Sequence, residues 1–467
     1  MGEREPKSKW LITIIGLLTT GAGYFIALVT KSPLDAISLF FIAVLLVIAG
    51  TYCLFTAGSI TLLKLMRKNK GYYYKTKHFT SISGMIYRMK QNAVGLANIC
   101  ILSTMVLVMI STTVSLYAGV EDALLTSYPT DIKIQMYNSE KSQRESALKL
   151  AKETVSQQNR NMTNLLDYRL LTIAVDRVDN TFTTDSGNRT YNADVTSLSF
   201  LSSGEYERLT NNIVNLSENE VLVYGLREDM GSSFTLFDQE YHIVKQLEDF
   251  PIESEYSSVI LDIFFIVVED EAVLEDLYQK QLAAYGENAS SMNYFISLDI
   301  DGSNDEKIAC YNAQIKAIRS IAPDSYIYCR QAVESEFYSL YGGLFFLGLF
   351  LGLLFLMATV LIIYYKQISE GYDDKERYDI MQKVGMSRSE VRSSISSQIL
   401  KVFFLPLVMS IIHIAAAFKM ITKLLLVFKL TNIPLFLGCT ALTILAFAII
   451  YAIVYVLTAK AYYRIVS

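Results

Sequence analysis

Long uncharged hydrophobic runs lie near both ends of the chain, whereas the middle has the mixed pattern of a soluble domain. A helix needs about 20 mostly apolar residues to cross the hydrocarbon core of a bilayer. Six segments meet this requirement, and the clearest contains GGLFFLGLFLGLLFLMATVLIIYY without any charged residue. We therefore predict about six transmembrane helices, over residues 10–30, 36–63, 94–117, 340–365, 399–418 and 434–458.

The residues between the third and fourth predicted spans are numerous enough to form a hydrophobic core of their own. Short β-rich runs predict strands at 131–137, 169–175, 220–224, 233–237, 259–268, 294–300 and 325–329. Helical periodicity predicts helices at 139–157, 271–284 and 306–321. The predicted fold class is a polytopic α-helical membrane protein with a large extracellular α+β domain inserted between spans 3 and 4.

Lys and Arg are concentrated in the N-terminus, in the loops after the second and fourth spans, and in the C-terminal tail. Short basic loops stay in the cytoplasm, so both termini are predicted to be cytoplasmic. Lys419, Lys423 and Lys429 resist this assignment, because they lie at the predicted outer end of the fifth span. We predict transmembrane helices over 1–63 (two helices), 94–117, 339–365 and 399–458 (two helices). A basic loop over 64–93, a coupling loop over 366–398 and a tail over 459–467 are predicted to be cytoplasmic. The domain over 118–338 is predicted to be extracellular.

Two small features of the sequence have more than one interpretation. Gly348 and Gly352 form a G-x-x-x-G pattern, which lets another helix approach closely but also occurs in glycine-rich membrane helices without such a contact. Cys310 and Cys329 both lie in the middle domain, where they could form a disulfide or remain free thiols.

Charge and residue chemistry limit what the middle domain can do. The net charge is −5, but residues 119–337 contain about 37 Asp and Glu against about 17 Lys and Arg. Nucleic acid is therefore excluded as a partner, and a cationic ligand is favoured. His242 is the one histidine of this region, and no metal-binding or nucleophile–base pattern surrounds it. No G-x-x-x-x-G-K-[ST] loop occurs either, so ATP hydrolysis by that route is not predicted. Because no catalytic pattern is seen, the chain is not predicted to be an enzyme, and we predict no metal and no cofactor.

The loop after the fourth span has the most specific pattern, KQISEGYDDKERYDIMQKVGMSRSEVRSSISSQ. Asp373 and Glu376 have the spacing of a capping box that would begin a short helix. An apolar stripe follows at helical spacing, Gly385 is placed to end the helix, and Ser387 begins a second box. Such a helix beneath the membrane could bind a protein or lie on lipid. Its balanced charges favour the protein.

The segment ERYDIMQKVGMSRSEV resembles the loop of FtsX-like ABC transporter permeases, whose typical form is E-R-x-x-E-I followed by Gly and a small polar residue. Asp379 stands where that family often has Glu. The segment YRMKQNAVGLANICIL and the two opening spans resemble the antimicrobial-peptide-export branch, named for bacitracin. Members of that branch have ten spans, and this chain resembles the last six. The residues that the resemblance assigns to ATPase coupling are Asp374, Glu376, Arg377, Tyr378, Ile380, Met381, Val384, Gly385 and Ser387.

The resemblance implies a permease in the bacterial cell membrane that couples ATP hydrolysis in a separate, dimeric cytoplasmic ABC ATPase to movement of the external domain. It also implies a role in resistance to cationic or cell-wall-targeting peptides, with a sensor histidine kinase as a further partner. One alternative is a receptor that senses such peptides and signals through the kinase without transport. A second is the cell-division type of FtsX protein, which has four spans and a small external domain, unlike this chain. A membrane enzyme is the least favoured alternative, because no catalytic pattern is present.

Overall fold

The computed structural model describes residues 9–30, 32–68, 76–178, 181–183, 195–256, 261–383 and 388–466. The chain divides into two compact units, one formed by Val120–Leu340 and the other by the described parts of Met1–Gly119 and Tyr341–Ser467. The first of these contains the sheet and is called the sheet unit. The second consists of long apolar helices and is called the span unit.

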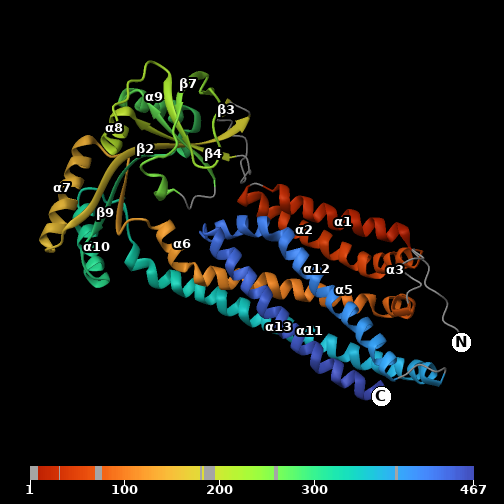
Figure 1. The fold of residues 1–467 in the computed structure, drawn as a ribbon. Coiled ribbons are helices and arrows are strands. Elements are labelled where there is room, and N and C mark those ends of the chain that lie inside the picture. The colour runs from red at the N-terminus through yellow and green to blue at the C-terminus, as the bar shows by residue number, and fades with distance from the viewer. Residues whose placement is uncertain are drawn as a thin grey trace. The chain divides into compact units, whose positions relative to one another are not determined.

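Six apolar helical segments of the span unit are long enough to cross a membrane, which agrees with the predicted number. They run over Trp10–Val29, Pro33–Lys68, Ala93–Ala118, Arg330–Lys375, Phe403–Val427 and Ile433–Ile465. The helices that contain them are α1 (Trp10–Val29), α2 (Pro33–Cys53) continued by the π-helix η1 (Leu54–Gly58) and α3 (Ser59–Lys68), α5 (Thr76–Ala118), α11 (Arg330–Lys383), α12 (Arg388–Val427) and α13 (Ile433–Val466), as Figure 1 shows. Helix α11 begins in the sheet unit and continues into the span unit.

Small residues bring the span helices into close contact. The buried side of α1 is a stripe of Thr, Gly and Ala, and a Cβ on Gly23 would lie 2.7 Å from Val47 of α2. The predicted G-x-x-x-G contact is present between α11 and α5: Gly348 lies against Thr113, and a Cβ on Gly352 would lie 2.7 Å from Ile110. Because lipid is as apolar as a leucine side chain, such backbone proximity is a main source of helix association in a membrane.

The sheet unit is built on one mixed ten-stranded sheet in the order β10-β1-β9-β2-β3-β6-β7-β5-β8-β4, with an additional β2–β4 pairing. Its strands are β1 (Ile132–Tyr137), β2 (Met162–Val178), β3 (Thr181–Thr183), β4 (Val195–Ser202), β5 (Glu220–Gly225), β6 (Ser233–Leu236), β7 (Gln239–Gln246), β8 (Asp262–Val268), β9 (Met292–Ile300) and β10 (Tyr326–Cys329). Its helices are α6 (Val120–Ser127), α7 (Lys141–Gln157), α8 (Ser203–Thr210), α9 (Glu271–Tyr285), α10 (Asn304–Arg319) and the 3-10 turns η2 (Glu253–Glu255) and η3 (Gly286–Asn288). The predicted α+β class is confirmed.

The two faces of β1 have different surroundings because side chains alternate along a strand. Ile132 and Ile134 are fully buried on the face that α7 and α10 cover, where these two helices pack side by side (Figure 1). Lys133, between them, points to the opposite face. Cys310 and Cys329 belong to the core beneath the two helices, and both are free thiols.

Candidate functional site

The end of α11 carries the residues predicted to couple to an ATPase, and its described part packs on α13. The buried carboxylate of Asp374 accepts a hydrogen bond from Tyr462 Oη of α13 at 2.6 Å, and Tyr462 is itself fully buried. A Cβ on Gly371, almost one turn earlier, would contact Tyr462 and Ile465 at 3.4 Å. This face of α11 is therefore fixed by α13.

A second buried group lies one turn before Asp374. Gln367 and Glu370 are both buried, and Lys366 Nζ lies 3.8 Å from Glu370 Oε1. A Cβ on Gly95 of α5 would lie 4.0 Å from Cδ of Lys366. The turns of α11 from Lys366 to Asp374 thus have buried polar side chains.

Beyond Asp374 the helix presents exposed side chains. Ile380 is 60% exposed, and Lys375 and Lys383 are exposed as well. Glu376, Arg377, Tyr378 and Met381 belong to the helical backbone of α11. Val384, Gly385 and Ser387 lie outside the described residues.

The prediction of a separate short helix that begins at Asp373 is wrong. Asp373 lies in the interior of α11, which continues without a break from Arg330 to Lys383. The capping-box spacing misled the prediction, because a neighbouring helix, and not a local cap, decides whether the preceding turns remain helical.

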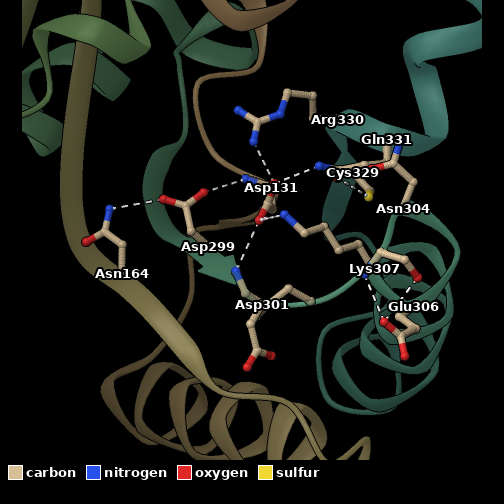
Figure 2. Close-up of polar contacts among 12 residues, drawn as sticks. Asp131, Asn164, Asp299, Asp301, Asn304, Glu306, Lys307, Cys329, Arg330 and Gln331 are labelled. Atoms are coloured by element: carbon tan, nitrogen blue, oxygen red, sulfur yellow. Dashed lines mark hydrogen bonds and ion pairs between the residues drawn. The ribbon is translucent and has the colours of Figure 1, made fainter.

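A second candidate site was not predicted at all, and it surrounds Asp131 at the start of β1 (Figure 2). Asp131 Oδ1 accepts hydrogen bonds from Arg330 Nη2 at 2.6 Å and from Gln331 Nε2 at 2.7 Å. Its Oδ2 accepts from Lys307 Nζ at 2.7 Å and from the backbone N–H of Ile300 at 3.1 Å. All four interactions meet a carboxylate whose side chain is only 2% exposed.

The Asp131 site connects the two ends of the sheet unit, because Asp131 lies near its first residues and Arg330 lies near its last. Arg330, the first residue of α11, donates from Nη1 to the carbonyl oxygens of Tyr128 at 3.3 Å and Pro129 at 3.0 Å. The backbone N–H of Asp131 donates to Asp299 Oδ1 at 2.8 Å, at the end of β9 (Figure 2). One carboxylate therefore connects β1, β9, α10 and α11.

Electrostatics favour the ionised form of Asp131. Burial by itself raises the pKa of this carboxyl, but the hydrogen bonds from Lys307 and Gln331 and the charge of Lys307 outweigh it, so the pKa lies below the ordinary value of 3.8. The carboxylate is consequently charged at neutral pH and is paired with two cations. Because all four donors bond to this one carboxylate, the arrangement positions the backbone segments that carry them.

A buried lysine on the other face of β1 forms a third polar cluster. Lys133 Nζ donates to Glu255 Oε2 and, at 3.3 Å, to Tyr168 Oη, and it lies 4.5 Å from the ring centroid of Phe295 and 5.5 Å from that of Tyr256. Burial, the largest influence, lowers the pKa of Lys133, although Glu255 raises it. An ammonium surrounded by aromatic faces and one carboxylate is a stable structural pair that fixes η2 on the sheet.

Two further observations concern the histidines and the metal-ligand residue types of the described part of the chain. His242 is exposed on β7, and no group of three or more His, Cys, Asp or Glu that could hold a metal ion occurs among the described residues. One polar residue that the sequence reasoning missed is His413, which is buried within the span unit. A histidine inside an apolar span is a recognisable signal, because ionisable groups are costly there.

Comparison with known proteins gives no matching family model but several relatives. ABC transporter permease protein YxdM of Bacillus subtilis (strain 168) is 25% identical over 434 residues, which cover 89% of this chain and 62% of YxdM. The uncharacterized ABC transporter permease YvcS of the same organism is 21% identical over 99% of this chain and 70% of YvcS. The bacitracin export permease protein BceB of Bacillus subtilis is 22% identical over 86% of this chain and 61% of BceB.

These relatives confirm the similarity to ABC transporter permeases that the sequence motif indicates. The chain spans about 62% of the length of YxdM, so it covers less than two thirds of that relative.

Proposed function

Because this chain is similar to ABC transporter permeases over most of its length, we propose that it is the permease component of an ABC transporter whose ATPase is a separate cytoplasmic subunit, acting as a dimer. The chain itself carries no catalytic site in this proposal. The residues that contact the ATPase are those of the 374–387 segment, which begins within the last turns of α11 and precedes α12 in sequence.

The observation that carries the proposal is the contrast between two positions of α11. Asp374 is buried against Tyr462, whereas Ile380 is exposed. Six residues along an α-helix correspond to a rotation of about 240°, so these two side chains point in different directions. Asp374 is held by α13, and Ile380 is available to a partner.

A partner that moves the exposed face also moves the helices that continue from it. Since α11 and α13 are joined by the Asp374–Tyr462 hydrogen bond and by the contacts of Gly371, a displacement of the 374–383 turns is transmitted to both helices. Closely packed interfaces change between discrete arrangements and do not deform continuously, which is the property that coupling to ATP hydrolysis requires.

The proposed substrate class is a peptide antibiotic that acts on the cell wall. The relative BceB is named for bacitracin export, and the acidic excess of residues 119–337 would attract a cationic peptide. In this proposal the sheet unit lies outside the cell, both termini are cytoplasmic, and a sensor histidine kinase is a further partner.

The proposal is tested by copurifying the tagged full-length chain with its ATPase from native membranes. Ile380→Asp places a charge on the exposed face of α11 and should reduce recovery of the ATPase at least tenfold, because burying an unpaired charge at an interface costs several kcal/mol. The matched control is Ile213→Asp, an equally drastic change at an apolar side chain of the sheet unit that is 85% exposed, which should leave recovery unchanged.

Two results would contradict the proposal. The first is undiminished recovery of the ATPase with Ile380→Asp, provided that the variant reaches the membrane at the wild-type level. The second is recovery of a histidine kinase with no ATPase, which would favour the non-transporting receptor.

A further inference from the structure

A cavity of about 300 Å³ lies within the span unit, between α1, α2, α5 and α12. Its walls are almost entirely apolar side chains, among them Val47, Ile48, Ile101, Met105, Val108 and Met420. Ligand pockets in proteins have volumes of about 300–1,000 Å³, so this cavity is large enough for part of a bound molecule.

The few polar side chains on the cavity wall are already satisfied. Thr51 Oγ1 donates to the carbonyl oxygen of Val47 at 2.6 Å, so its oxygen can accept from Nε2–H of His413, which lies 3.1 Å away. His413 Nδ1 then accepts from Tyr24 Oη at 2.6 Å. Thr104 donates to the carbonyl oxygen of Cys100 at 2.8 Å. The two ring nitrogens of His413 are thus both hydrogen-bonded within the wall.

A cavity with such walls excludes water and favours hydrocarbon. Water needs two to four polar partners to remain in a cavity, whereas apolar cavities of about 150 Å³ stay dry and bind small hydrophobic molecules. Phe41, which also lines this cavity, is 69% exposed at the surface of the span unit. Since the surroundings of that surface in a membrane are lipid, an acyl chain is the hydrophobic occupant at hand.

Two lysines of α12 adjoin, in sequence, residues that line the cavity. Lys419 and Lys423 are one turn apart on α12, and Met420 and Ile421, which lie between them in sequence, both line the cavity. Lys419 is exposed, and its Nζ donates to the carbonyl oxygen of Leu28 at 2.8 Å, at the end of α1. Lys419 and Lys423 are two of the three lysines that do not fit the distribution of positive charge expected from the predicted topology, the third being Lys429.

We propose that this part of the span unit binds an anionic glycerophospholipid of the bilayer, with one acyl chain in the cavity and the phosphate at Lys419 and Lys423. The cavity supplies a dry apolar site for the chain, and the lysines select the head group by charge. This assignment explains why Lys is placed at an end of α12 where the topology disfavours it. It depends on the membrane-spanning nature of the helices and is independent of coupling to an ATPase.

The test is lipid binding to the detergent-purified full-length chain, measured by native mass spectrometry with dioleoyl phosphatidylglycerol and, at the same chain length, dioleoyl phosphatidylcholine. The wild type should bind phosphatidylglycerol more tightly. A basic residue near an anionic lipid surface contributes about fivefold, so Lys419→Gln with Lys423→Gln should weaken phosphatidylglycerol binding about 30-fold and leave phosphatidylcholine unchanged. Lys460→Gln, at an exposed lysine outside the cavity, is the charge control.

The acyl-chain part is tested by filling the cavity. Val47→Trp should weaken binding of both lipids more than tenfold, because each excluded methylene costs about fourfold. Leu445→Trp, at a side chain that is 58% exposed on α13, should have no effect. If Val47→Trp does not fold, Ile101→Phe serves the same purpose. A phosphatidylglycerol with a photoreactive acyl chain should also label Met105 or Val108 in the unmodified protein.

Equal affinity of the wild type for the two lipids would overturn the assignment of the head group. Unchanged binding in a cavity-filling variant, or labelling confined to other surfaces, would overturn the assignment of the cavity. If a copurifying protein protected Met105 and Val108 from the photoreactive lipid, a partner helix and not a lipid would occupy the cavity, and the proposal would be wrong.

Discussion

Substitution of Asp131 by Asn should destabilise β1 and the segments bonded to Asp131 more than any conservative change at an exposed carboxylate. The substitution keeps the shape of the side chain but removes its charge, so Lys307 and Arg330 lose the anion that both contact. The new side chain would also place its NH₂ group opposite the N–H donor of Gln331 or Ile300, and two donors cannot form a hydrogen bond with each other. Removing one partner of a buried ion pair costs about 3–5 kcal/mol.

Hydrogen exchange in the full-length chain measures this effect locally. A loss of about 3–5 kcal/mol should accelerate exchange of the β1 backbone amides, Ile132–Tyr137, by about 150- to 5,000-fold. Asp301→Asn is the matched control: Asp301 is a partly exposed carboxylate near Asp131 that accepts hydrogen bonds from the backbone N–H and the side-chain amide of Asn161. Acceleration of less than tenfold in Asp131→Asn, or equal acceleration in the control, would refute the reasoning.

The pH dependence gives an independent measurement of the same interaction. Because the folded-state pKa of Asp131 is lowered, its stabilisation is complete above the unfolded value near 3.8 and is lost as the pH falls through the folded-state pKa. The wild type should therefore lose protection of β1 in acid below about pH 4. Asp131→Asn should show a smaller acid-dependent loss over the same interval.

Two further substitutions test the packing of each unit. Gly352→Val should destabilise the span unit by about 1–3 kcal/mol, because the added side chain meets Ile110. Gly343→Val is the control, because its side chain enters open space and should have little effect. Equal midpoints of thermal unfolding in the two variants would contradict the contact. Glu255→Gln should lower the free energy of β1 opening, measured by hydrogen exchange, by about 3–5 kcal/mol. Adding Lys133→Met should recover part of that loss, since no charge is then left unpaired. A double variant less stable than the single variant would disprove the pairing.

The spans and most strands of this protein could be predicted from hydrophobic pattern, but some strands could not. Strand β7 was missed because the β6–β7 turn consists of Phe237 and Asp238, both with positive φ, in place of the Asn-Gly or Asp-Gly pair that usually indicates a two-residue hairpin. Strand β4 was missed because it is rich in Ser and Thr yet lies buried in the sheet, where Ser199 bonds to Thr172 at 3.0 Å.

The sites were less predictable because they are formed by residues far apart in sequence. The motif that ends α11 has a fixed local spacing, so it could be found from the sequence, but the partner of Asp374 on α13 could not. Asp131 and Arg330 are separated by almost the entire sheet unit, and neither has a neighbourhood that distinguishes it from a surface charge. Only the register of β1 with β9 and β10 brings them together.

Strand β2 has a consequence for how this protein can change over evolution. Its 17 residues pair with β9 in the first part and with β4 and β3 in the second, and its side chains enter the cores on both sides of the sheet. A recombination that exchanged only one part of the sheet unit would divide this strand and expose two cores at once. An exchange of segments that keeps β2 intact is therefore the one that preserves both cores.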